Sequence, residues 1–387
     1  MNLRILIGFA DALAAIESAW CLRDDGFEVV AFAREGTKPA LARSRTVRVV
    51  AITPPEQDAL ACAADLTALI RELYPSAVLP LDDHAVWLCD RAYAEFTSAD
   101  QPVIAGPVGP LAAIALDKRQ QLRAAEAAGL SVPPTVEVGG GQPPGDGPWI
   151  VKPAMAVELS EGRLRRPTGR SAATIAQVQE VAAAIGGPAI AQPLIEGTGE
   201  GVFGLAAEGG VVAWSAHRRI RMMNPRGSGS SACRSIPVAA ELGAPVGDFI
   251  AKTGWRGLFM IEFLRDVTGR PWFMELNGRA WGSMALACLR GYAYPSWAVR
   301  QAMRQEFVPS EPEAAPHLTA RHLGREVVHL GAVLTHGGAP RLKTVRNVVA
   351  LRRSDRWYNW RRGELGVFAA DSLATIRGQL NGRSRSW

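Results

Sequence analysis

The stretch FMIEFLRDVTGRPWFMELNGRAWGS, residues 259–283, carries the strongest structural and chemical signal in this chain. Two apolar segments flank RDVTG, a polar turn that contains a glycine. This pattern predicts a β-hairpin whose turn is centred near Val267 and Thr268. The hairpin is of interest because two glutamates, Glu262 and Glu275, interrupt its otherwise apolar strands.

With the turn centred there, Glu262 is expected opposite Phe273, and Glu275 opposite Met260. Side chains alternate along a strand, so the two glutamates would share one face as diagonal neighbours, about 7–8 Å apart. A slip of one residue in this register would put them on opposite faces.

Asn277 and Arg279 follow Glu275 with the same period of two, so all of these side chains are expected on one face. Two carboxylates and an amide oxygen suit Mg²⁺, which takes hard oxygen ligands and shares them with nucleotide phosphates. An adjacent guanidinium would bind an anion through two hydrogen bonds. The alternative is that both glutamates lie on the solvated face of an amphipathic hairpin.

Lysine is scarce: the 387 residues include 43 Lys and Arg, of which the lysines are only Lys38, Lys118, Lys152, Lys252 and Lys343. Lys152 ends the apolar strand WIVKP, where a cation is costly unless it is paired or points into a site. Lys118 starts a helix over 117–128, which Asp117 is expected to cap with Gln120 as its capping-box partner. The two lysines suggest a phosphate-binding pair, although each is equally explained as a snorkelling surface residue.

Composition excludes several classes of protein. Apolar residues make up 48% and charged residues 21%, which argues against global disorder. The net charge of +6 permits a polyanionic partner, but no recognition motif accompanies it, so nucleic acid is not expected as a partner. The five scattered cysteines indicate neither a disulfide framework nor a zinc site, and the N-terminus indicates neither a membrane span nor a cleaved leader. We therefore expect a cytoplasmic protein.

The first 114 residues alternate strand-like and helix-like patterns, which predicts a parallel, doubly wound α/β domain. The expected strands are 3–8, 27–33, 46–52 and 77–81, with helices over 11–24 and 57–73. The fingerprint GxGxxG is missing after the first strand, so a nicotinamide-binding domain is not expected. A second domain is expected over 115–300, and an Arg- and Trp-rich C-terminal extension with a weaker pattern over 301–387.

The order of these motifs resembles the ATP-grasp superfamily: Asp117-Lys118 at a helix start, Lys152-Pro at a strand end, QPLIEGTGE at 192–200, then the Glu…Glu-x-Asn-x-Arg hairpin. The resemblance covers roughly residues 1–300. It implies a pre-ATP-grasp N-terminal domain, a two-lobed α+β ATP-grasp domain, and the cofactors ATP and Mg²⁺ or Mn²⁺. It also implies a ligase that phosphorylates a small-molecule carboxylate and joins the acyl-phosphate to an amine.

The resemblance assigns roles to particular residues. Lys118 and Lys152 would contact the ATP phosphates, and Arg279 would face the transferring phosphate. Glu262, Glu275 and Asn277 would bind the metal. The hinge beside adenine would consist of Gln192, Leu194 and Ile195, with Glu200 at the ribose hydroxyls. The alternatives are plain strand residues for Gln192 and Leu194, and a turn carboxylate for Glu200.

The segment 215–235 is the candidate for substrate recognition. His217, Arg219 and Arg221 share a face of a predicted strand, with Arg218 expected on the other face. RGSGSS at 226–231 offers backbone N–H groups as an anion nest. We count His217 and Arg219, with Arg279, as candidate catalytic residues. A polar strand edge with a mobile linker is the alternative.

Other features admit two interpretations. The loop 153–172 has four arginines and few glycines, so it either covers the phosphates or is a solvated basic loop. Asp82, Asp83 and His84 follow the strand 77–81, at the edge where α/β sheets bind ligands, or form a local turn. The tail 352–362 would stack on a polyanion, or form a helix that packs its tryptophans on the core.

Rival functions are a phosphotransferase on the same scaffold with a hydroxyl acceptor, and a non-catalytic module that binds nucleotides or polyanions. The sequence leaves open the identity of the acid and the amine, and the oligomeric state, a homodimer included.

Overall fold

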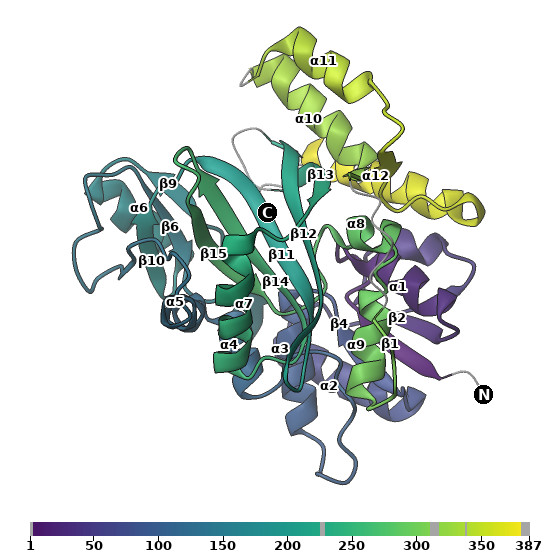
Figure 1. Ribbon diagram of the computed structural model, residues 1–387. Helices are drawn as coiled ribbons and strands as arrows, with labels where there is room; N and C mark the ends of the chain where they lie inside the picture. The colour runs from purple at the N-terminus through teal and green to yellow at the C-terminus, as the bar shows by residue number, and fades with distance from the viewer. Residues whose placement is uncertain (1–2, 225–228, 310–316, 337–338, 381–387) are drawn as a thin grey trace.

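The computed structural model describes residues 3–224, 229–309, 317–336 and 339–380, and it opens on a sheet of four parallel strands (purple to blue in Figure 1). The strand order is β3-β2-β1-β4. The strands are β1 (Arg4–Gly8), β2 (Glu28–Arg34), β3 (Val47–Ile52) and β4 (Ala77–Pro80). The helices are α1 (Ala15–Asp24), α2 (Ala59–Leu73) and α3 (Asp83–Ala94), with a short 3-10 turn η1 (Ala40–Arg43).

Helices cover both faces of this sheet, which explains why its strands are apolar without alternation. Ile5 and Ile7 of β1 are fully buried on the α1 side, and Leu6 is fully buried on the side of α2 and α3. The predicted parallel, doubly wound architecture is therefore confirmed.

Two short helices lead into the next part of the chain, α4 (Pro110–Leu116) and α5 (Lys118–Ala127). Asp117 caps α5 by accepting a hydrogen bond of 2.8 Å from the Arg119 N–H. The predicted capping box with Gln120 does not form, because the Asp117 N–H donates to the Ala113 carbonyl at the end of α4. The cap fixes Lys118 in the first turn of α5.

A small lobe follows, a four-stranded antiparallel sheet in the order β5-β10-β6-β9. Its strands are β5 (Val136–Glu137), β6 (Trp149–Pro153), β9 (Arg170–Ala172) and β10 (Ala189–Pro193). Helix α6 (Ile175–Ile185) packs against the face that carries Trp149 and Val151. Because side chains alternate, Lys152 and Gln192 lie on the other face. A hairpin of β7 (Glu158–Ser160) and β8 (Arg163–Arg165) extends from this lobe.

The large sheet lies between the small lobe and the N-terminal sheet (Figure 1), with the strand order β15-β14-β11-β12-β13-β16-β17. All its neighbours are antiparallel except β16 and β17. The strands are β11 (Gly197–Ala207), β12 (Gly210–Met222), β13 (Ser230–Ile236), β14 (Gly257–Asp266), β15 (Pro271–Asn277), β16 (Thr319–Arg321) and β17 (Asp355–Trp357). Helix α7 (Ala240–Thr253) packs on one face over an apolar core that includes Ile261 and Leu276.

The predicted β14–β15 hairpin forms, but its predicted register is wrong. Glu262 pairs with Glu275 rather than Phe273, and Met260 pairs with Asn277. Two irregularities shift the pairing by one residue each: the turn places Phe263 opposite Phe273, and a bulge between Glu262 and Phe263 passes over Met274 of β15. The two glutamates are therefore directly opposite each other, and the expectation that they share one face is confirmed.

The C-terminal part is more ordered than its weak sequence pattern indicated, because β16 and β17 extend the large sheet. Helices α8 (Met284–Leu289) and α9 (Tyr294–Ala302) lead into it. Its own helices are α10 (Leu323–His336), α11 (Arg341–Val349) and α12 (Leu365–Leu380), with a 3-10 turn η2 (Arg362–Glu364). The tail 352–362 forms β17 and turns instead of the expected helix. Of its aromatic rings, Tyr358 is buried and Trp357 lies under the Arg321 guanidinium, whereas Trp360 is 50% exposed.

Across the described ranges, every helix falls short of the length and apolar character that a membrane span requires.

Candidate active site

Three side chains with oxygen ligands project from one face of the β14–β15 hairpin, the face opposite to α7. Glu262 and Glu275 are register partners, and Asn277 lies two residues after Glu275. The Asn277 amide Nδ2 is 3.5 Å from Glu275 Oε1, which turns the two side chains toward each other. The hairpin thus places two carboxylates and an amide side by side.

Two lysines approach these oxygens from other elements. Lys118 Nζ of α5 lies 3.9 Å from Glu275 Oε2. Lys152 Nζ of β6 donates a hydrogen bond of 3.0 Å to Gln192 Oε1, and Gln192 Nε2 donates to Thr135 Oγ1 at 2.8 Å. The scarce lysines that the sequence singled out therefore converge on the acidic hairpin.

The proximity of these charges shifts their ionisation. Desolvation lowers the pKa of Lys152 to about 8, and the neighbouring Lys118 cation acts in the same direction against the pull of Glu275. Burial opposes ionisation of Glu275, but Lys118 and Lys152 outweigh it and hold the pKa of this carboxyl below its ordinary value. The cluster therefore contains a carboxylate that stays ionised and a lysine that titrates near neutral pH.

Two cavities meet at this cluster. One, of about 240 Å³, is lined by Lys118, Lys152 and the turn after β8. The other, of about 210 Å³, is lined by Arg219, His217 and Arg279. Arg166, Glu275 and Asn277 line both, so the acidic hairpin forms the wall between a lysine-lined and an arginine-lined chamber.

Arg279 is held by a carboxylate from the N-terminal sheet. Its Nε lies 3.0 Å from Asp83 Oδ1, and Arg166 Nη2 lies 3.0 Å from Asp83 Oδ2. Burial opposes ionisation of Asp83, but the Arg279 and Arg166 guanidiniums outweigh it and hold its pKa below the ordinary value. Of the two interpretations of the Asp-Asp-His segment, the structure therefore favours a place at the site for Asp83.

His217 and Arg219 both line the arginine-lined chamber, as their shared face predicted. Arg219 Nη2 lies 2.5 Å from Glu262 Oε2, so this guanidinium is bound to a carboxylate of the acidic hairpin. His217 Nδ1 lies 2.8 Å from Ser283 Oγ, while its buried Nε2 has no hydrogen-bond partner among the described residues. Burial, with the Arg219 cation acting in the same direction, lowers the pKa of His217 to about 3, so the imidazole is neutral at neutral pH.

Other predicted residues do not join the cluster. Glu200 lies on the α7 side of the sheet, where Arg218 and Arg265 bind its two oxygens at 2.7 and 2.9 Å. Arg218 is on the opposite face from His217, as predicted, but Arg221 binds Glu326 of α10 instead of entering the chamber. A ribose-binding role for Glu200 therefore has no geometric support.

The expected hinge runs from Gln192 to Ile195 between the small lobe and β11. Gln192 is buried and engaged with Lys152, whereas Leu194 is exposed and its N–H donates to the Pro148 carbonyl at 2.8 Å. Ile195 is in the same connection, between β10 and β11. In the expected anion nest at 226–231, residues 226–228 lie outside the described part of the chain, and Ser230 and Ser231 belong to β13.

The sequence pattern did not predict a role for Gln121 at the site. Its side chain accepts a hydrogen bond from the Leu276 N–H at 2.9 Å and donates to the Leu276 carbonyl at 3.1 Å, which ties α5 to β15. The position of Gln121, one helical turn after Lys118, is a weak signal in the sequence.

Arg166 could not be selected from the arginines of the loop 153–172 by sequence, because only the fold turns it toward Asp83.

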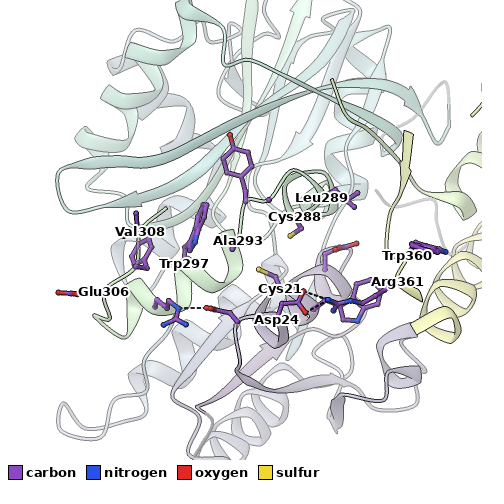
Figure 2. A pocket seen from close by; sticks show the side chains of 17 residues that line it. Cys21, Asp24, Cys288, Leu289, Ala293, Trp297, Glu306, Val308, Trp360 and Arg361 are labelled. Carbon is purple, nitrogen blue, oxygen red and sulfur yellow. Dashed lines mark hydrogen bonds and ion pairs between the residues drawn. The ribbon is translucent and has the colours of Figure 1, made fainter. Parts of the chain in front are cut away.

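A larger cavity, of about 620 Å³, lies elsewhere, between α1, α8, α9 and the turn after β17 (Figure 2). None of the predicted site residues lines it. Two of its carboxylates are already bound to guanidiniums, Asp24 to Arg361 at 2.5 Å and Asp25 to Arg300 at 2.7 Å. The convergence of charged groups thus favours the two smaller chambers as the site of chemistry.

The oxygen-bearing side chains of the hairpin can be compared with the ligands that Mg²⁺ takes in proteins. The described residues hold no group of three or more His, Cys, Asp or Glu side chains that would cage a metal. Glu262, Glu275 and the Asn277 amide offer oxygens from one face, which suits an ion that completes its coordination with phosphates and water. The residues therefore fit a magnesium ion that arrives with a nucleotide.

No protein-family model and no curated protein sequence matches this chain. Solved structures do match it. The biotin carboxylase domain of Hydrogenobacter thermophilus 2-oxoglutarate carboxylase, solved with MgADP, ADP and bicarbonate, has a TM-score of 0.59 and 17% identity, over 80% of this chain and 72% of that one.

Two further structures give similar values. The L-amino acid ligase from Bacillus licheniformis has a TM-score of 0.57 and 17% identity, over 82% of this chain and 78% of that one. The N5-carboxyaminoimidazole synthetase from Staphylococcus aureus, solved with ADP, has a TM-score of 0.59 and 13% identity, over 80% of each chain. These structures are ATP-grasp enzymes, and with a parallel N-terminal sheet, a small lobe and a large antiparallel sheet, this chain has the ATP-grasp fold.

Proposed function

We propose that this protein is an ATP- and Mg²⁺-dependent ligase that phosphorylates a carboxylate and joins the acyl-phosphate to an amine. One observation carries the proposal: two of only five lysines meet two carboxylates and an amide at the boundary of two chambers. The lysine-lined chamber suits the phosphates of ATP, and the arginine-lined chamber suits an anionic acceptor. Structural neighbours solved with ADP, and in one case MgADP, support the same assignment.

Each residue then has a defined role. Lys118 and Lys152 bind phosphate oxygens, while Glu262, Glu275 and Asn277 hold Mg²⁺, or Mn²⁺, against them. The metal supplies neutralisation of the charge that develops during phosphoryl transfer. The hinge around Leu194 and Ile195 borders the adenine.

The proposed chemistry has two steps. A carboxylate oxygen of the acid attacks the γ-phosphorus, the bond from this phosphorus to the β–γ bridging oxygen breaks, and ADP leaves with that electron pair. The nitrogen of a neutral amine then attacks the acyl carbon, the bond from this carbon to the phosphate oxygen breaks, and inorganic phosphate leaves while the nitrogen releases a proton.

Within this scheme Arg279 neutralises the transferring phosphoryl group, and Asp83 keeps its guanidinium oriented. Acyl-phosphates hydrolyse in water, so the lobes are expected to close around the intermediate.

The test is an ADP-release screen of small acids and amines with ATP and Mg²⁺. We expect ADP release that requires an acid and rises with the right amine. Hydroxylamine provides the second measurement, because an acyl-phosphate yields a hydroxamate and a phosphate ester does not. ADP release without hydroxamate would favour the phosphotransferase alternative, and failure to bind an ATP analogue would overturn the proposal.

A further inference from the structure

Arg325 of α10 differs from the other arginines that line the arginine-lined chamber. Its side chain is buried, with 5% of the residue exposed. Its one hydrogen bond in the described structure runs from Nη1 to the Ser230 carbonyl, at 3.0 Å. Within the ranges that the structure describes, no carboxylate lies within 4.0 Å of its guanidinium, whereas Arg219, Arg279 and Arg166 each have one.

One carboxylate in the neighbourhood of Arg325 is already engaged. Asp371 of α12 lies within electrostatic reach of Arg325, but its Oδ2 is 3.0 Å from His322 Nε2 and accepts a hydrogen bond of 3.0 Å from Asn359 Nδ2. Burial lowers the pKa of Arg325, which reflects the cost of a buried cation without a close counter-charge. A buried guanidinium of this kind is a binding site for an anion from solution.

The position of Arg325 separates it from the phosphate end of the site. Arg219 interacts electrostatically with both Glu275 and Arg325, and neither Lys118 nor Lys152 is in the lining of this chamber. Beside Arg325 the chamber wall is made by Tyr358, Cys233 and Ser230. Both Arg325 and Tyr358 come from the C-terminal extension, which thus completes the chamber at the end away from the lysines.

The charges indicate which anion fits. At the phosphate end the cations outnumber the carboxylates: Lys118 and Lys152 face Glu275, and Arg279 and Arg166 share Asp83. The excess of positive charge suits a nucleotide. Arg219 is neutralised by Glu262. At the far end a single guanidinium balances one monoanion, which is the charge of a carboxylate.

We propose that Arg325 binds a carboxylate that does not react, so that one substrate of the ligase carries a carboxylate besides its reacting group. This inference rests on the proposed function for the identity of the chamber as the acceptor site. Two sources supply the same chemistry: the second carboxylate of a dicarboxylic acid, or the carboxylate of an amino acid that serves as the amine.

The test is isothermal titration of matched pairs of small molecules in the presence of Mg²⁺ and a non-hydrolysable ATP analogue. Succinate against butyrate examines the acid source, and alanine against ethylamine examines the amine source. We expect the member with the extra carboxylate to bind more tightly in at least one pair. In Arg325→Gln that preference is expected to fall by roughly 10- to 100-fold, as for the loss of a charged hydrogen bond.

Arg356→Gln is the matched control, because Arg356 is an exposed arginine of β17 in the same extension. It should keep the wild-type preference, and Arg325→Lys should keep part of it. No preference in either wild-type pair, or a preference unchanged in Arg325→Gln, would overturn the inference. If Arg325→Gln does not fold, the wild-type pairs and Arg325→Lys carry the test. Binding of the ATP analogue alone, measured in the same titrations, separates failure of this inference from failure of the proposed function.

Discussion

Asp83 and Arg279 join two parts of the molecule that are 196 residues apart in the chain. Asp83 begins α3, directly after the N-terminal sheet, and Arg279 follows β15 of the large sheet. Arg279 Nε is 3.0 Å and Nη2 is 3.4 Å from the two carboxylate oxygens, so the contact has two points. The proposed phosphate-binding arginine therefore depends on the N-terminal domain for its orientation.

Asp83→Asn should weaken both the fold and the chemistry. Removal of one partner of a buried ion pair costs about 3–5 kcal/mol, because the remaining cations lose their counter-charge. We expect a lower free energy of unfolding in urea and a lower kcat, with the affinity for an ATP analogue less affected. Asp248→Asn, an exposed position on α7, is the control. Equal stability and kcat in Asp83→Asn and wild type would contradict the role.

Glu275→Gln should abolish turnover without unfolding the protein. The substitution keeps the size of the side chain but removes the charge that faces Lys118 and that would face the proposed metal. We expect kcat to fall by on the order of 100-fold or more, as when a group that stabilises a transition state is lost. Glu208→Gln, at a carboxylate that is 91% exposed, should retain activity. Unchanged turnover in Glu275→Gln would refute the metal assignment.

ATP affinity should decline at alkaline pH through Lys152. Because the pKa of Lys152 is lowered to about 8, the cation is present at pH 7 and is lost as the pH rises through 8. Phosphate binding favours the charged form, so binding near pH 8 should also take up a proton. Titrations in buffers of different ionisation enthalpy measure this uptake. Lys152→Met should bind the analogue weakly at every pH and take up no proton there; a wild-type affinity independent of pH from 7 to 9.5 would oppose the assignment.

His217 should stay neutral and act without transferring protons. With its pKa lowered to about 3, the folded protein holds an uncharged imidazole, while the unfolded chain protonates near pH 6.5. Stability linked to His217 is therefore fully present above pH 6.5 and is lost as the pH falls toward 3. We expect wild type to lose more stability than His217→Asn between pH 7 and 5, measured by urea unfolding. If NMR showed that His217 protonates near pH 6 in the folded protein, this result would contradict the neutral state.

Local patterns predicted much of the fold. The apolar runs of β1, β2 and β6 followed from hydrophobicity, and the Asp117 cap of α5 followed from residue type, since both act between near neighbours. The hairpin register did not, because local hydrophobicity specifies neither the exact position of the turn nor the bulge between Glu262 and Phe263. The C-terminal strands also escaped prediction, since three-residue strands such as β16 form only by pairing with a distant neighbour.

The site was predictable where a residue type was rare and unpredictable where it was common. Lys118 and Lys152 stood out because lysines are few, and the structure brings both to the acidic hairpin. Glu200 resembled a ligand in sequence, yet two arginines neutralise it on the other face of the sheet. Arg325 gave no signal at all, although the structure makes it the buried guanidinium of the chamber without a carboxylate partner among the described residues.

The sequence by itself determined the alternating strands and helices of the N-terminal sheet, the acidic hairpin and the two lysines, because these depend on the period and rarity of residues along the chain. The tertiary structure alone decided which arginine is paired with a carboxylate and which, among the described residues, is not. Arginines are chemically equivalent in a sequence, and the partner of each is fixed by contacts that span from a few residues to more than a hundred, as between Arg221 and Glu326. Ion pairs form between residues that are close in space, so only the folded chain determines which charged side chains are paired.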